Sequence, residues 1–171
     1  MNQLDRLNEL PADHAEAELL KCCGSTRWAR EMAAARPFAD VEGLLNKADA
    51  VWHSLGQQDW LDAFHAHPKI GEQKAAATQS EQAQSWSAQE QSGVQSASAA
   101  TATALTAGNR EYEQRFGFIF IVCATGKTSA EIVAILSERL QNDTETELNN
   151  AAEEQRKITR LRLLKSLESG V

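Results

Sequence analysis

The sequence contains no long apolar run and no excess of basic residues, and these absences exclude several classes of protein. A membrane-spanning helix needs about 20 consecutive apolar residues, so we expect no transmembrane segment and no membrane partner. The formal net charge is −7 and the pI is about 5.1, which argues against a nucleic-acid partner because such proteins present a basic face. The N-terminus also lacks the apolar stretch of a secretory signal, and we therefore expect a cytoplasmic protein.

Cysteine is equally scarce, with only Cys22, Cys23 and Cys123 in the chain. An odd number that includes an adjacent pair does not form a disulfide framework, and it fits a reducing compartment. Cys123 follows the apolar residues 120–122, where a cysteine is more often a small buried side chain than a nucleophile. We therefore expect no catalysis by cysteine, and a redox role for the adjacent pair stays open.

Helical periodicity, in contrast, is present almost throughout the sequence. Apolar residues recur at steps of three and four, which is the pattern of helices with one buried face. We predict an all-α fold, with a single domain over residues 1–171 that forms a helical bundle of about seven to nine helices. Asp40 is placed to cap the helix that follows it. Further helices are predicted at residues 13–23, 26–35 and 57–66, around 132–140, and along a C-terminal stretch from 148 to 164.

Two stretches depart from this periodicity. Residues 116–123 are aromatic and β-branched, but a lone strand has no partner. We interpret them as a buried segment, extended or helical, that leaves a helix, with Gly117 easing a close approach. Residues 74–108 are rich in Ala, Ser, Gln and Thr, which is compatible with a flexible linker. Because a step of three to four persists from Val94 onwards, we favour a loop up to about Trp86 and then a long helix.

Motifs for nucleotides and metals are weak. A phosphate loop ending at Gly126-Lys127-Thr128 would need a second glycine at position 121, which is Ile121. Thr128 and Glu131 have the spacing of a helix capping box instead. His65 and His67 lie two residues apart, which on a helix directs them to different faces. We therefore expect no metal site, although a metal-dependent hydrolase that uses both histidines and a carboxylate is one alternative.

His67 and Glu90 each permit a structural and a functional interpretation. Pro68 disfavours helix at His67, so the preceding helix should end there with the imidazole on its buried side, where it could hold a proton near neutral pH. The pattern alone favours a structural histidine. Ser87 and Glu90 have capping-box spacing, as do Thr144 and Glu147. A helix start at Ser87 could also hold an anionic ligand on its free N–H groups.

The C-terminal helix carries three arginines, of which two can be placed by helix geometry. Arg162 lies about 40° from Ile158 and borders the apolar stripe, whereas Arg160 should face solvent. Arg156 is undecided. An arginine beside a buried stripe needs a partner, which is either a structural carboxylate or a bound ligand.

Five short blocks spread over residues 28–163 form a recognisable series. They are Arg36-Pro37-Phe38 after the helix of Trp28, His67-Pro68-Lys69-Ile70-Gly71, Ser87-Ala88-Gln89-Glu90-Gln91, Tyr112-Glu113-Gln114-Arg115-Phe116-Gly117-Phe118, and the ending with Glu154, Lys157, Ile158, Leu161, Arg162 and Leu163. In this order and spacing they resemble the 2-oxo-4-hydroxy-4-carboxy-5-ureidoimidazoline (OHCU) decarboxylases. One departure is Ile119, where many members of that family have proline, and it removes no chemical group.

The resemblance implies an all-helical enzyme that needs no cofactor and decarboxylates OHCU to (S)-allantoin in urate breakdown. It assigns His67 as the catalytic histidine, Glu90 as its acidic partner and Arg162 as the arginine that anchors the ligand. Related folds also suggest a homodimer. The rival interpretation is a helical module that binds a partner protein. The substrate-binding stretches correspond to Pro68, to Ser87, Ala88, Gln89, Glu90 and Gln91, and to Phe120, Ile121, Val122, Cys123 and Ala124.

Overall fold

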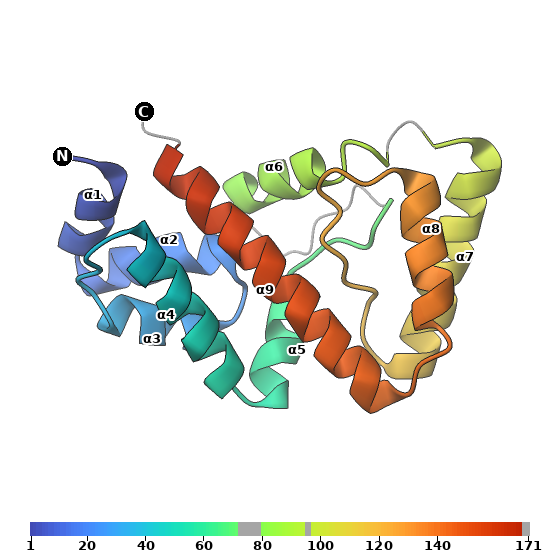
Figure 1. Ribbon diagram of the computed structural model, residues 1–171, viewed down its shortest axis with the longest axis horizontal. Helices are drawn as coiled ribbons and strands as arrows, with labels where there is room; N and C mark the ends of the chain where they lie inside the picture. Colours follow the sequence, from blue (N-terminus) through green and yellow to red (C-terminus); the bar gives the residue numbers. More distant parts are fainter. Residues whose placement is uncertain (72–79, 95–96, 169–171) are drawn as a thin grey trace. The chain divides into compact units, whose positions relative to one another are not determined.

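The computed structural model describes residues 1–71, 80–94 and 97–168, and within these ranges it contains nine α-helices and no β-strand (Figure 1). The predicted all-α fold is therefore confirmed. None of the helices in these ranges is both long and apolar enough to cross a membrane. The helices are α1 (Gln3–Glu9), α2 (Ala12–Cys22), α3 (Thr26–Ala34), α4 (Val41–Ser54), α5 (Gln57–His65), α6 (Glu81–Glu90), α7 (Ala99–Phe116), α8 (Ser129–Arg139) and α9 (Thr144–Glu168).

The chain divides into two compact units. The first unit contains Met1–Ala63 together with Arg156–Val171, and the second contains Phe64–Gln155. The boundary falls inside α9, so this helix contributes its first half to the second unit and its second half to the first. That the whole chain acts as a single domain stays a prediction.

The first unit is organised around an aromatic side chain of α3. Trp28 is fully buried, and its indole nitrogen Nε1 donates to the carbonyl oxygen of Ala48 at 3.1 Å, so the one polar atom of this side chain is paired. Asp40 caps α4 as predicted, because its Oδ1 accepts from the N–H of Gly43 at 2.7 Å. Side chains from α2, α3 and α4 fill the remaining core, including Leu19, Met32 and Leu44.

Arg36 shows that the first of the five sequence blocks has a structural role. Its Nη1 donates to the carbonyl oxygens of Leu7 and Leu10, both at 2.7 Å, and its Nε donates to that of Ala33 at 2.9 Å. Carbonyls in the last turn of a helix have no partner within the helix. The guanidinium therefore joins the end of α1 to the end of α3.

In the second unit, helix α6 begins earlier than predicted. Ser80 caps α6, with its hydroxyl accepting from the N–H of Ala83 at 3.2 Å, so the prediction of a loop up to Trp86 is wrong. The long helix predicted from there is also interrupted, because the chain turns after Glu90 and α7 begins only after its cap at Ser98. The early part of the predicted loop, residues 74–79, lies outside the described residues.

Two of the three proposed capping boxes can be judged at helices α8 and α9. At α8 the box is confirmed, since the side chains of Thr128 and Glu131 each accept from the other's backbone N–H, at 3.3 and 2.8 Å. At α9 it is wrong, because Asp143 provides the cap by accepting from the N–H of Thr146 at 2.8 Å. Glu147 is fully buried and bonds to side chains of other elements instead.

Gly117 ends α7, but for a different reason from the one expected. Its φ of 81° is left-handed, a conformation that glycine adopts without steric cost. No atom lies within 4 Å of the position that a Cβ would take, so the expectation of a close approach is wrong. The chain then runs through residues 118–124 as a non-helical segment whose seven side chains are all buried.

A close approach does occur at Gly93, in the turn after α6. A Cβ at this position would lie 2.4 Å from the carbonyl oxygen of Lys127. We expect Gly93→Ala to destabilise the protein by about 1–3 kcal/mol, because backbone rather than a mobile side chain has to move. Urea titration measures this change. Gly56→Ala is the control, since its Cβ would meet Asp59 at an ordinary 3.8 Å, and equal effects of the two substitutions would contradict the prediction.

Candidate active site

His67 lies directly after α5, where Pro68 was expected to end the helix. Its backbone N–H donates to the carbonyl oxygen of Phe64 at 3.1 Å, which closes the last turn. The imidazole is half-buried, and its Nε2 lies 2.6 Å from Oε1 of Gln155 on α9. Gln155 is itself only 1% exposed. The ring is therefore fixed by a contact between residues 88 positions apart in the sequence.

The loop that follows His67 is held by two other helices. Asn109 of α7 donates from its side chain to the carbonyl oxygen of Ile70 at 2.7 Å. Gln91, at the end of α6, accepts from the N–H of Gly71 at 3.0 Å through its Oε1. Gly71 has a φ of 85°, which suits glycine. These bonds bring the loop of His67 next to the end of the Ser87–Gln91 block.

Ser87 and Glu90 lie in the last turn of α6, not at its start, so the proposed capping box is wrong. The carbonyl oxygen of Ser87 accepts from the N–H of Gln91 at 3.1 Å, as in a helix interior. The expected set of free N–H groups near Ser87 is therefore also wrong. A spacing of three residues serves equally well to place two side chains on one helix face. Here both are buried, whereas Ala88 and Gln89 point outward.

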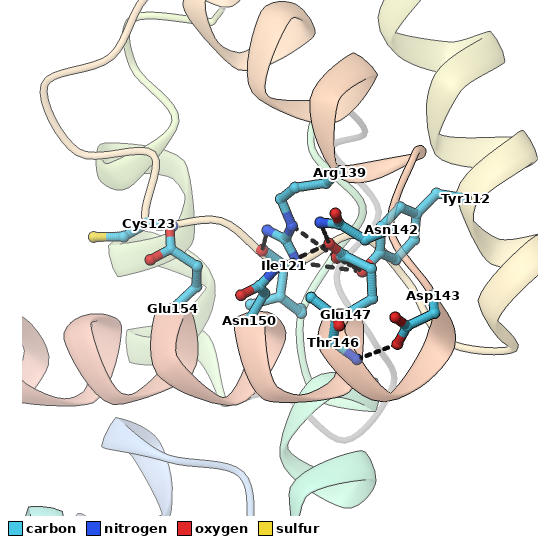
Figure 2. Close-up of polar contacts among 10 residues, drawn as sticks. All are labelled: Tyr112, Ile121, Cys123, Arg139, Asn142, Asp143, Thr146, Glu147, Asn150 and Glu154. Atoms are coloured by element: carbon cyan, nitrogen blue, oxygen red, sulfur yellow. Dashed lines mark hydrogen bonds and ion pairs between the residues drawn. The ribbon is translucent and has the colours of Figure 1, made fainter.

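The segment 120–124 comes close to Glu90 and to α9. Burial raises the pKa of the Cys123 thiol. The positive charge of Lys127 lowers this pKa, and the negative charges of Glu154 and Glu90 raise it further. Glu154, which lies beside Cys123 in Figure 2, accepts from the backbone N–H of Cys123 at 3.4 Å. Lys127 Nζ donates to the carbonyl oxygen of Cys123 at 2.8 Å. One carboxylate and one ammonium group thus bond to the backbone of Cys123, and the charge of Glu90 acts on its thiol.

A buried ionic cluster holds the other end of the same segment (Figure 2). Arg139 of α8 donates from Nη1 to the carbonyl oxygen of Ile121 and from Nε to Glu147 at 2.8 Å. The hydroxyl of Tyr112 donates to the same carboxylate at 2.5 Å. Burial tends to raise the pKa of Glu147, but hydrogen bonds from Tyr112 and Asn142 and the charge of Arg139 lower it overall. Burial raises the pKa of Tyr112.

Arg162 belongs to the first unit and is buried, as its predicted place beside the stripe requires. Its Nη1 lies 3.4 Å from the carbonyl oxygen of Lys21. Arg160 is not simply solvated, because it donates to Asp49 at 2.8 Å with its side chain 32% exposed. Arg156 shares the same carboxylate at 3.2 Å. The buried arginine of this helix is therefore the one that the resemblance assigns to the ligand.

Comparison with known proteins decides the family. A model of the OHCU decarboxylase family matches residues 8–164 of the 171. The chain belongs to the OHCU decarboxylase family. A crystal structure of OHCU decarboxylase in the presence of (S)-allantoin has a TM-score of 0.77 and 36% sequence identity to this chain, and covers 89% of it and 98% of that chain.

Two relatives illustrate the range of lengths within the family. The uric acid degradation bifunctional protein TTL of Arabidopsis thaliana is 37% identical over 150 residues, which make up 88% of this chain and 46% of that protein. An OHCU decarboxylase of Haloferax volcanii is 26% identical over 170 residues, 99% of this chain and 96% of that protein. The chain thus spans about half the length of the Arabidopsis protein and 33% and 32% of two Bacillus bifunctional proteins.

Within this family member, the second unit brings together most of the residues named from the sequence. His67, Pro68, the Ser87–Gln91 block and residues 120–124 all belong to it, whereas Arg162 belongs to the first unit. Sequence reasoning missed Gln155 and the cluster of Arg139 and Glu147. Among the described residues, no group of three or more His, Cys, Asp and Glu side chains could hold a metal ion.

The cysteines are expected to be unreactive in the folded protein. Burial raises the pKa of Cys22 to about 12 and that of Cys23 to about 11, from 9.0, although the charge of Arg162 lowers both. Since the thiolate is the reactive form, each shift of two units slows alkylation about a hundredfold. Iodoacetamide at pH 7.5, followed by mass spectrometry, should label Cys22 and Cys23 at least that much more slowly in native than in guanidinium-unfolded protein. Rapid labelling of the native pair would contradict this.

Proposed function

We propose that this chain decarboxylates OHCU to (S)-allantoin without a cofactor, in the cytoplasm and as a homodimer. The observation that carries the proposal is that His67, Glu90 and residues 120–124 gather in one unit, linked through α6, α7 and α9. The names of the relatives support the same reaction, since the Haloferax protein is an OHCU decarboxylase and the matching crystal structure was obtained with (S)-allantoin.

The substrate chemistry explains why no cofactor is needed. OHCU carries a carboxylate and a hydroxyl on one ring carbon, beside an unsaturated group. When the bond to the carboxylate breaks and CO₂ leaves, the electron pair delocalises into that neighbouring group, so no separate electron sink is required. The neighbouring, ureido-bearing carbon then takes up one proton on one face, while the hydroxyl loses its proton and its carbon becomes a carbonyl carbon of allantoin. The protein has to orient the carboxylate, stabilise the developing charge and supply this proton.

We assign these tasks to three side chains and one stretch of backbone. His67 handles the proton at the reacting carbon, and Glu90 orients the imidazole or binds N–H groups of the substrate. Arg162 and backbone N–H groups of residues 120–124 bind the substrate oxygens. Pro68, Ser87 and Gln91 complete the binding residues, together with Ala88 and Gln89. His67 and Glu90 are the two candidates for the final proton donor.

Arg162→Ala should weaken substrate binding. A hydrogen bond to a charged group contributes about 1.5–3 kcal/mol, so we expect KM to rise about 10- to 150-fold. Arg160→Ala is the control on the same helix, since it removes a partly exposed ion pair with Asp49 that contributes about 1 kcal/mol or less to stability. Steady-state kinetics with both variants measures the difference. Similar small effects on KM would contradict the role given to Arg162.

The proposed reaction can be tested directly with substrate generated in situ. Urate oxidase and 5-hydroxyisourate hydrolase convert urate to OHCU, and circular dichroism follows the formation of optically active allantoin. We expect this protein to accelerate the reaction and to yield the (S) enantiomer. Formation of racemic allantoin at the uncatalysed rate would overturn the proposed function. Light scattering tests the homodimer, which should have twice the 18.8 kDa mass of one chain.

A further inference from the structure

Gln155 contacts one ring nitrogen of His67 directly. Its Oε1 lies 2.6 Å from Nε2 of the imidazole, and its side chain is almost completely buried. A carboxamide oxygen only accepts hydrogen bonds, so this contact is a hydrogen bond when Nε2 of the imidazole carries a hydrogen. We infer that Gln155 is a positioning residue that holds neutral His67 in the tautomer with its proton on Nε2, so that Nδ1 exchanges the proton of the reaction. This inference rests on the proposed function.

The geometry around His67 leaves the ring little freedom to escape this arrangement. Pro68 restricts the backbone of His67, and the N–H of His67 is bonded to Phe64 at 3.1 Å. Rotation of the ring away from Gln155 would break a short contact with a buried side chain, which is unfavourable. The contact with Gln155 therefore orients the ring, in the way that a carboxylate orients the histidine of a catalytic triad.

The position of Gln155 in the sequence links the histidine to the proposed substrate-binding backbone. Gln155 follows Glu154, which accepts from the N–H of Cys123 at 3.4 Å. Two consecutive residues of α9 thus bind His67 and the 120–124 segment, and both partners belong to the second unit. The rigid rise of a helix fixes the spacing between consecutive residues. We expect Gln155 to place Nδ1 at a constant distance from this segment.

The test separates a hydrogen-bonding role from a packing role by two substitutions. Gln155→Met keeps the length of the side chain but removes the acceptor, whereas Gln155→Glu keeps an acceptor oxygen and adds a buried charge. If Gln155 acts only by packing, Gln155→Met should retain more activity than Gln155→Glu. If it acts by accepting a hydrogen bond, Gln155→Glu should retain more. Gln141→Met is the control, because Gln141 is exposed at the end of α8.

Nuclear magnetic resonance of protein labelled with ¹⁵N-histidine reads the tautomer without any turnover. Two-bond proton–nitrogen correlations should place the proton of neutral His67 on Nε2 in the wild type and in Gln155→Glu. The hydrogen-bonded ring N–H should give a slowly exchanging proton resonance that is lost in Gln155→Met. A wild-type ring that carries its proton on Nδ1 would overturn the inference, whether or not the variants fold.

Kinetics supplies the second measurement. Gln155→Met should lower kcat about 10- to 100-fold, a part of the 10²- to 10⁴-fold that general acid–base catalysis contributes, and should leave KM within about threefold. Gln155→Glu should recover most of the lost kcat. Full activity in Gln155→Met with an intact wild-type reaction would overturn the inference. If the wild type does not decarboxylate OHCU but the Nε2 proton depends on Gln155, then the proposed function fails and the assignment of the tautomer stands.

Discussion

His67→Asn should abolish enzymatic release of CO₂ while leaving the fold intact. Loss of a general acid or base lowers kcat by about 10²- to 10⁴-fold, and asparagine cannot exchange a proton near neutral pH. The substitution removes the contact of the imidazole with buried Gln155, so we expect the fold to be retained with a thermal midpoint lower by roughly 2–12 °C. Initial rates of (S)-allantoin formation and thermal melting measure the two effects.

His65→Asn is the matched control, because His65 is exposed in the last turn of the same helix. It should retain wild-type activity. Near-wild-type turnover in His67→Asn would remove the central assignment of the proposed mechanism. Glu90→Gln then distinguishes the two candidate donors. If Glu90 delivers the final proton, Glu90→Gln should be as inactive as His67→Asn, and if it only orients the imidazole, the variant should keep a measurable part of kcat.

Glu147→Gln should destabilise the protein more than Gly93→Ala does. It leaves the buried guanidinium of Arg139 without a counter-charge, which costs about 3–5 kcal/mol. For a chain of this size, that corresponds to a fall in the thermal midpoint of roughly 6–20 °C. Glu145→Gln, exposed two residues earlier on α9, is the control and should shift the midpoint very little. Equal midpoints for the two variants would show that the ionic cluster does not support the fold.

The same cluster predicts how stability depends on pH. The folded-state pKa of Glu147 lies below its ordinary value of 4.5, so its ionised form is favoured by folding. This contribution is fully present above pH 4.5 and is lost as the pH falls through the lowered pKa. As the pH drops below 4.5, the thermal midpoint of the wild type should therefore decrease more steeply than that of Glu147→Gln. Parallel pH profiles of the two proteins would contradict this.

The elements that could be predicted from the sequence are those with local signals. Apolar residues at steps of three and four gave the all-α fold, Pro68 gave the end of α5, and Asp40 gave the cap of α4. The capping boxes show the limit of such signals. A serine or threonine three residues before a glutamate has the same spacing at a helix start, as at Thr128, and in a helix interior, as at Ser87.

The contacts that shape the site have no local signal at all. Gln155 meets His67 across 88 residues of sequence, and Tyr112 meets Glu147 across 35. Glutamine and glutamate on a helix are usually solvated, so a periodicity argument assigns them to the surface. Here they lie on the buried side of α9, because folding supplies partners that the sequence does not reveal. The resemblance to a family predicts His67 and Glu90 as site residues, but it does not predict Gln155, which contacts His67.

The non-helical stretch after Gly117 has a consequence for how this family can evolve. Backbone N–H and C=O groups inside a helix are hydrogen-bonded to each other. In an all-helical protein, backbone groups can therefore bind a small molecule only where a helix ends or is interrupted. Residues 118–124 form such an interruption, and all seven of their side chains are buried. If the ligand reads peptide groups there, the side chains of that stretch are constrained by volume and not by chemistry. Exchanges such as Ile121→Val or Val122→Ile should then drift neutrally, while a polar replacement of equal size should be eliminated.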